Sequence, residues 1–248
     1  MKKYMIIFLF IFVLLAACGT TGGGQAGSGE AAGPTGTNEH VMIDWVDFVK
    51  LNDVQYTGLH QSVIANPDRI GKQIGKVKFK VADNVTNPQY RVKNGDAAFL
   101  AKGTKIYAVE QKPNYVAVKD KREVNGYKLF FADHAEGEFN QYLKDMDKDK
   151  MEKIEIYHQN AAAKPKLLNQ ISQQKDIESL IGLLDSGEPH THFKPNHSQG
   201  PVERYQIVIY TNHPIAHTNM ISYDHEKWFW HPGSTEILSN KIEKYLSR

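Results

Sequence analysis

The chain has 248 residues, of which 41% are hydrophobic and 23% are charged, and these ordinary fractions exclude a wholly disordered protein. The formal net charge is +2, and removing Lys2 and Lys3 with a leader segment leaves 28 basic side chains against 28 acidic ones. Such a balance gives no electrostatic case for binding nucleic acid, which normally requires a basic surface. Cys18 is the only cysteine, which excludes an internal disulfide and a cysteine-based zinc site.

The N-terminus has the pattern of an export signal. Lys2 and Lys3 form a short cationic start, and an uncharged run over residues 4–17 follows them. This run is shorter than the roughly 20 residues of a membrane-spanning helix and has the length of a signal-peptide core. Small residues then precede Cys18. The pattern predicts a signal peptide over residues 1–17 that is removed on export.

The tetrad Leu15-Ala16-Ala17-Cys18, followed by Gly19, resembles the lipobox of bacterial lipoprotein precursors. The resemblance implies that the Cys18 thiol receives a diacylglyceryl group and that a dedicated signal peptidase cleaves before it. Two or more acyl chains, such as palmitate, anchor a protein stably. The expected location is therefore the extracytoplasmic face of the cell membrane. An ordinary secreted protein or an uncleaved anchor remains the alternative.

Residues 18–40 are predicted to hold the lipidated cysteine and a flexible tether. The stretch after Cys18 is rich in Gly, Ala, Ser and Thr and has no apolar periodicity. Such a sequence buries too little surface to offset its ordering entropy. About 20 residues of this kind give a typical reach of roughly 25 Å, enough to hold a domain clear of the lipid headgroups.

The region 41–145 is predicted to be mostly β. Val77, Phe79 and Val81 alternate with lysines, which is the period of a strand with one buried face. The intervening lysines are interpreted as a solvated face rather than a binding stripe. Further strands are expected at 104–109, 115–119 and 127–132, with turn signals at 94–96 and 125–126.

The strings GTKIYAV, NYVAVK and NGYKLFF within this region resemble an SH3-like bacterial barrel. The resemblance favours a small antiparallel barrel or sheet over a sandwich, and it assigns no binding residue. A charged stretch from Asp145 to Lys153 is the expected joint to the next domain.

The region 150–248 is predicted to be an α+β domain, an antiparallel sheet with two helices. Strands are expected at 153–157, 204–211, 215–223 and 227–231. Ile177, Leu180, Ile181 and Leu184 have helical spacing, with caps expected at Ser172 and Gly187. Leu238, Ile242, Tyr245 and Leu246 predict a second helix that ends the chain. The order of these elements predicts helices packed on one side of the sheet.

Histidines predict a metal site as one alternative function. Seven of the 11 histidines fall between 190 and 231, and neutral imidazole is a ligand for zinc, copper or nickel. His190 and His192 are the best local pair, because alternate residues of an extended segment point the same way, and His197 is close enough to join them. Separate hydrogen bonds made by surface histidines are the favoured interpretation, because histidine number alone does not show convergence.

Ser222, Asp224 and His225 contain the groups of a hydrolase triad, but no G-x-S-x-G elbow surrounds the serine. An envelope hydrolase is therefore a second alternative. Trp228 and Trp230 share one face of an expected strand. If this face is exposed, it is a possible surface for a protein or sugar partner. Packing beneath the terminal helix is the favoured interpretation of the pair.

The sequence as a whole resembles uncharacterised surface lipoproteins of Gram-positive bacteria. We expect a lipid-anchored extracytoplasmic protein with a non-catalytic binding or scaffolding role at the cell surface. Its expected partners are the membrane, through lipid on Cys18, and a protein or envelope component. No nucleic acid and no cofactor are expected, apart from a transition metal in the alternative based on His190, His192 and His197.

Overall fold

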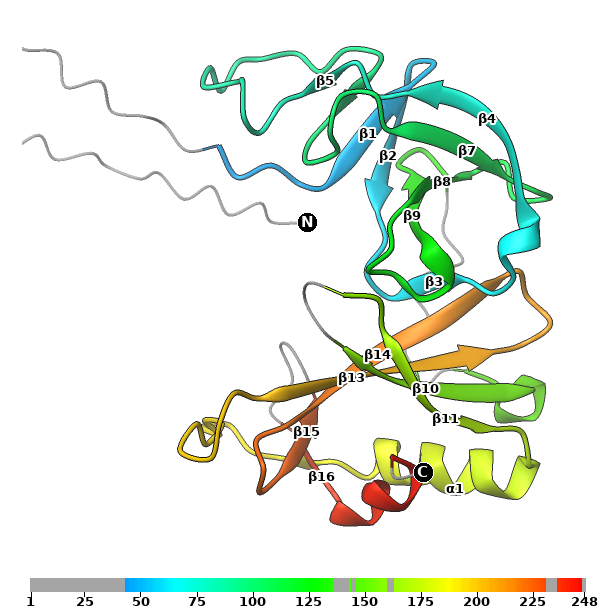
Figure 1. Ribbon diagram of the computed structural model, residues 1–248, viewed down its shortest axis with the longest axis vertical. Coiled ribbons are helices and arrows are strands. Elements are labelled where there is room, and N and C mark those ends of the chain that lie inside the picture. Colours follow the sequence, from blue (N-terminus) through cyan, green and yellow to red (C-terminus); the bar gives the residue numbers. More distant parts are fainter. Residues whose placement is uncertain (1–42, 136–142, 144–145, 160–162, 231–235, 247–248) are drawn as a thin grey trace, which may run out of the picture. The chain divides into compact units, whose positions relative to one another are not determined.

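The computed structural model describes residues 43–135, 143, 146–159, 163–230 and 236–246. Cys18, the signal segment and the whole of the predicted tether lie outside these residues. The described chain is rich in strands and contains one α-helix and one longer 3-10 helix (Figure 1). The α+β class is confirmed in broad terms. In the described ranges, no helix is long and apolar enough to cross a membrane.

The first sheet is built from the N-terminal half of the chain, in the order β4-β7-β8-β9-β2-β1-β6-β5. Neighbouring strands are antiparallel except for the parallel pair β5 and β6. The strands are β1 (Phe48–Leu51), β2 (Val54–Gly58), β4 (Ile70–Lys76), β5 (Phe79–Lys80), β6 (Asp96–Ala97), β7 (Lys105–Val109), β8 (Tyr115–Lys119) and β9 (Tyr127–Ala132).

This sheet curls into a half-barrel. Gly75 of β4 lies against Leu51 of β1, because a Cβ added at Gly75 would come 2.6 Å from Leu51 Cδ1. These two strands are far apart in the strand order, so the sheet must bend to bring them together. Ile106, Val116 and Phe130 fill the concave side as fully buried side chains. Of the expected small antiparallel barrel or sheet, the structure therefore shows an open, curled sheet.

The single strand expected around Val77 is also corrected. β4 ends at Lys76 and β5 begins at Phe79. Between them Val77 bonds across to the 103–104 turn, with its N–H 2.9 Å from Thr104 O and its carbonyl 2.8 Å from Gly103 N. The alternation of apolar residues and lysines therefore spans two short strands rather than one.

The second sheet follows the order β11-β10-β13-β14-β15-β16-β12 and is antiparallel throughout. Its strands are β10 (Lys153–Gln159), β11 (Lys166–Ile171), β12 (Glu188–Pro189), β13 (Glu203–Tyr210), β14 (Ile215–Tyr223), β15 (Trp228–Trp230) and β16 (Glu236–Leu238). An eighth strand, β3 (Ser62–Ile64), comes from the N-terminal half and pairs with the first part of β14. Ile64 lies opposite Ile215 in this pair.

The helix α1 (Gln174–Asp185) packs on one face of the second sheet. Its apolar stripe, Ile177, Leu180, Ile181 and Leu184, is buried as the spacing predicts. Full burial of one such side chain stabilises a fold by about 1.5–3 kcal/mol. The N-cap is Gln173, which makes no capping side-chain bond, so the expected cap at Ser172 is wrong.

The second expected helix is present as a shorter 3-10 helix, η5 (Asn240–Tyr245). Leu238 belongs to β16, and the helix begins after Ser239, whose hydroxyl oxygen accepts from the Lys241 N–H. Three residues per turn place Ile242 and Tyr245 on the same face, and both are buried in the core. The remaining short 3-10 turns are η1 (Pro67–Arg69), η2 (Val124–Gly126) and η4 (Lys148–Lys150).

Candidate functional site

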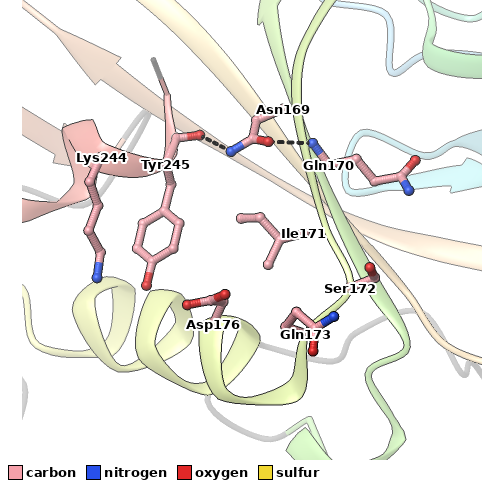
Figure 2. A pocket seen from close by; sticks show the side chains of 8 residues that line it. All are labelled: Asn169, Gln170, Ile171, Ser172, Gln173, Asp176, Lys244 and Tyr245. Atoms are coloured by element: carbon pink, nitrogen blue, oxygen red, sulfur yellow. Dashed lines mark hydrogen bonds between the residues drawn. The ribbon is translucent and has the colours of Figure 1, made fainter. Parts of the chain in front are cut away.

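A pocket of about 390 Å³ lies where the end of β11, the start of α1 and η5 meet. Figure 2 shows its eight lining side chains. They are Asn169, Gln170, Ile171, Ser172, Gln173, Asp176, Lys244 and Tyr245. Apart from Ile171 and the Tyr245 ring, every lining side chain is polar, so the pocket suits a small ligand that hydrogen-bonds.

One side chain fixes the shape of the pocket. The Asn169 Nδ2 donates to the Tyr245 carbonyl oxygen at 2.8 Å, while its Oδ1 accepts from the Gln170 N–H at 2.8 Å (Figure 2). The first bond joins the C-terminal segment to β11. The second satisfies a backbone donor on β11, which is an edge strand of its sheet. Asn169 therefore holds two walls of the pocket at a fixed separation.

The pocket carries one charge of each sign. Asp176 extends from α1 and Lys244 from η5, and both are exposed. The Lys244 Nζ lies 4.5 Å from the centre of the Tyr245 ring, within the range of a cation–π contact. Tyr245 itself is only 5% exposed. A ligand that carries both an ammonium and a carboxylate would find a complementary group for each.

A second polar cluster surrounds Glu155, which is 7% exposed, on the face of β10 opposite α1. Its carboxylate accepts from Lys153 Nζ at 2.7 Å, from the Tyr157 hydroxyl at 2.6 Å and from the Tyr210 hydroxyl at 2.5 Å. Lys153 Nζ also lies 4.1 Å from the Tyr210 ring centre. Sequence reasoning missed this cluster, although the K-x-E-x-Y alternation on one strand face could have shown most of it.

The charge of Glu155 is fully compensated. Burial raises the pKa of its carboxyl, but the lysine and the two tyrosine donors outweigh burial and hold the pKa below its usual range. Burial and the hydrogen bonds to Glu155 raise the pKa of Tyr157 and Tyr210 far above the usual value. At neutral pH the cluster is therefore one carboxylate held by three donors, which is the arrangement of a structural network.

The structure places His190, His192 and His197 in the segment between β12 and β13, and all three are exposed. The His190 ring packs edge-on against Phe193, with ring centres 6.1 Å apart. In the part of the chain that the structure describes, no group of three or more His, Cys, Asp or Glu side chains is placed to hold a metal ion. The metal site remains a prediction.

Asp224 and His225 of the suggested triad bond to backbone groups, and the buried Ser222 hydroxyl has no hydrogen-bond partner among the described residues. The Asp224 carboxylate accepts from the N–H groups of Asn196, Glu226 and Lys227. Burial raises the pKa of Asp224, but these N–H donors outweigh it, so the pKa is lowered. The His225 Nε2 lies 3.0 Å from the Pro201 carbonyl oxygen. Ser222 is fully buried. These contacts hold the turn between β14 and β15.

The tryptophan pair packs into the core of the second sheet. Trp228 is 3% exposed and its Nε1 donates to Glu243 Oε1 at 3.1 Å. Trp230 is partly buried against the same core, with its Nε1 3.3 Å from the Leu184 carbonyl oxygen. Packing beneath the terminal segment, the favoured interpretation of the sequence, describes Trp228, whereas Trp230 bonds to α1.

Comparison with known proteins finds no match to this chain. No known protein family, no curated protein and no solved structure matches it. The site is therefore interpreted from its own residues.

Proposed function

We propose that this chain is a lipoprotein held on the extracytoplasmic face of the membrane through lipid on Cys18, and that its folded part has a binding role there. One observation carries the proposal. The only cysteine of the chain stands directly after an uncharged run of 14 residues that ends in two small residues, in a Leu-Ala-Ala-Cys tetrad. A secreted protein would need no cysteine at that position.

Two features of the folded part support a binding role. The pocket beside β11 offers neutral hydrogen-bonding groups together with Asp176 and Lys244. Asn169 holds its walls in place before any ligand arrives. A preformed site loses less conformational entropy on binding, which favours affinity for a small ligand. The division of the exported part into residues 41–145 and 150–248 belongs to the same proposal.

The anchor is tested by changing Cys18→Ala in the full chain, with Thr20→Ala as the matched control next to it. We expect the parent and Thr20→Ala to incorporate fatty acid and to fractionate with membranes. The Cys18→Ala chain should incorporate none and should leave the membrane fraction or accumulate as an uncleaved precursor. Equal fatty-acid labelling of the Cys18→Ala chain would refute lipidation at this residue.

The pocket is tested with free amino acids, which carry both charges. A ligand present at ten times its dissociation constant should stabilise the fold by about 1.4 kcal/mol, which raises the melting temperature by a few degrees. Asp176→Asn and Lys244→Gln should abolish the shift, whereas Lys241→Gln, which changes an exposed lysine outside the lining, should not. A shift that survives Asp176→Asn and Lys244→Gln would remove the pocket from the proposal.

A further inference from the structure

Positive charge is concentrated in one part of a chain whose exported portion is otherwise balanced. Residues 70–105 carry eight basic side chains and two acidic ones. Both acids are already engaged, because Asp83 pairs with Lys80 at 2.8 Å and Asp96 accepts from the Tyr90 hydroxyl at 2.8 Å. The excess charge of this segment is therefore available to a partner.

The fold gathers four of these lysines into one surface, which we call the basic patch: Lys76, Lys78, Lys102 and Lys105. Lys76 lies directly opposite Lys105 in the pairing of β4 with β7. The bonds that join Val77 to residues 103 and 104 bring Lys78 and Lys102 to the same corner. All four side chains are exposed. Like charges placed directly opposite each other destabilise a sheet, so this pair has a cost that a bound anion would remove.

Two exposed apolar side chains belong to the same sheet, beyond the other end of β5 and β6 from Lys78. Val46 is 66% exposed and Phe99 is 50% exposed, and among the described residues they are the large hydrophobic side chains that stand out to solvent. The Ala98 N–H donates to the Phe48 carbonyl oxygen at 3.0 Å, which brings together the two segments that carry them. Phe99 is three residues from Lys102, and Val46 lies in the segment that leads into β1 (Figure 1).

We propose that the basic patch, Val46 and Phe99 form a docking face for a membrane surface with anionic headgroups. This inference rests on the proposed anchoring for its setting. Lysines are attracted by anionic lipid, and a neighbouring apolar side chain gains by entering the headgroup region. The 24 residues 19–42 separate the lipidation site from the described fold. As the predicted tether, they would give a reach of roughly 25–30 Å, which is enough for the face to contact the bilayer that holds Cys18.

The face can be tested without the anchor. All five hydrophobic clusters draw only on residues between 45 and 246, so residues 40–248 contain the packing that forms the fold. This unlipidated chain is sedimented with phosphatidylcholine vesicles that contain or lack phosphatidylglycerol. We expect it to bind only the anionic vesicles, and to bind them less at high salt.

Three variants separate the contributions, and their melting temperatures should stay at or above that of the parent. Each lysine near an anionic surface strengthens binding about fivefold, so Lys76→Gln with Lys105→Gln should weaken it about 30-fold. Phe99→Ser should weaken it about fivefold or more. The matched control, Lys175→Gln with Lys241→Gln, removes the same charge from exposed residues of α1 and η5 and should bind like the parent.

Several outcomes would overturn the docking face. They are equal sedimentation with both kinds of vesicle, equal weakening by the control pair, or binding to soluble polyphosphate without binding to vesicles. Because the tested chain lacks Cys18, any of them leaves the lipidation experiment untouched. Conversely, loss of fatty-acid labelling in cells would not alter the sedimentation result.

Discussion

The stability of the fold is expected to fall between pH 6.5 and pH 4 because of His217 on β14. Burial lowers the pKa of this imidazole to about 4 from an ordinary value of 6.5, with Asn219 partly opposing the shift. In this window the unfolded chain binds a proton that the folded chain does not, so the free energy of unfolding decreases as the pH falls. Well below pH 4 both states are protonated and the contribution of His217 no longer changes.

The size of the effect follows from the displacement of the pKa. One pKa unit corresponds to 1.36 kcal/mol, so the full loss of stability between pH 7 and pH 4 is about 3 kcal/mol. At pH 5 the loss due to His217 is about 2 kcal/mol. With a urea dependence of about 2 kcal/mol per M, the unfolding midpoint should move by about 1 M.

Urea unfolding of residues 40–248 at pH 7, 6 and 5 measures this loss directly. His217→Gln cannot be protonated, so its loss between pH 7 and pH 5 should be about 2 kcal/mol smaller than that of the parent. Subtracting the two profiles cancels the contribution of the carboxyl groups to the free energy of unfolding, because these groups titrate in both proteins. His190→Gln, which replaces an exposed histidine, should keep the dependence of the parent. Parallel profiles for the parent and His217→Gln would show that burial of this imidazole does not control the pH response.

Three further predictions concern the second sheet and the histidine segment. Tyr210→Phe removes one donor from the buried Glu155 carboxylate and should lower the free energy of unfolding by about 2 kcal/mol; no change would contradict the network. Ile181→Ala leaves a void beneath α1 and should cost about 2–5 kcal/mol by urea unfolding, against under 0.5 kcal/mol for the exposed Glu178→Ala. If His190, His192 and His197 bind a transition metal, elemental analysis should find about one ion per chain and none after His190→Ala; an ion-free parent chain ends that hypothesis.

Strands with a clear local signal could be predicted from the sequence. β8 and β9 coincide with the expected ranges 115–119 and 127–132, and β14 coincides with 215–223. In each case a short apolar or alternating run lies between turn residues, so local preference and burial agree. The buried stripe of α1 was predicted for the same reason, because spacing along one helix is a local property.

Features that depend on partners distant in sequence could not be predicted. The β3 segment has only three residues, and its place in the second sheet depends on β14, about 150 residues later. The burial of His217 depends on the residues that pack over β14. These residues cannot be identified from the sequence around His217. The pocket joins residues 169–176 to residues 244–245, so its formation needs the η5 segment to return to β11.

The strand β3 also determines what happens when the two halves of this chain are separated. Ser62, Val63 and Ile64 form backbone pairs with the first residues of β14, although they belong to the other half of the chain. A fragment cut after residue 150 would expose the edge of β14 where β3 had been, and such edges recruit other strands. We therefore expect the isolated C-terminal half to aggregate and to regain solubility when a peptide covering β3 is supplied.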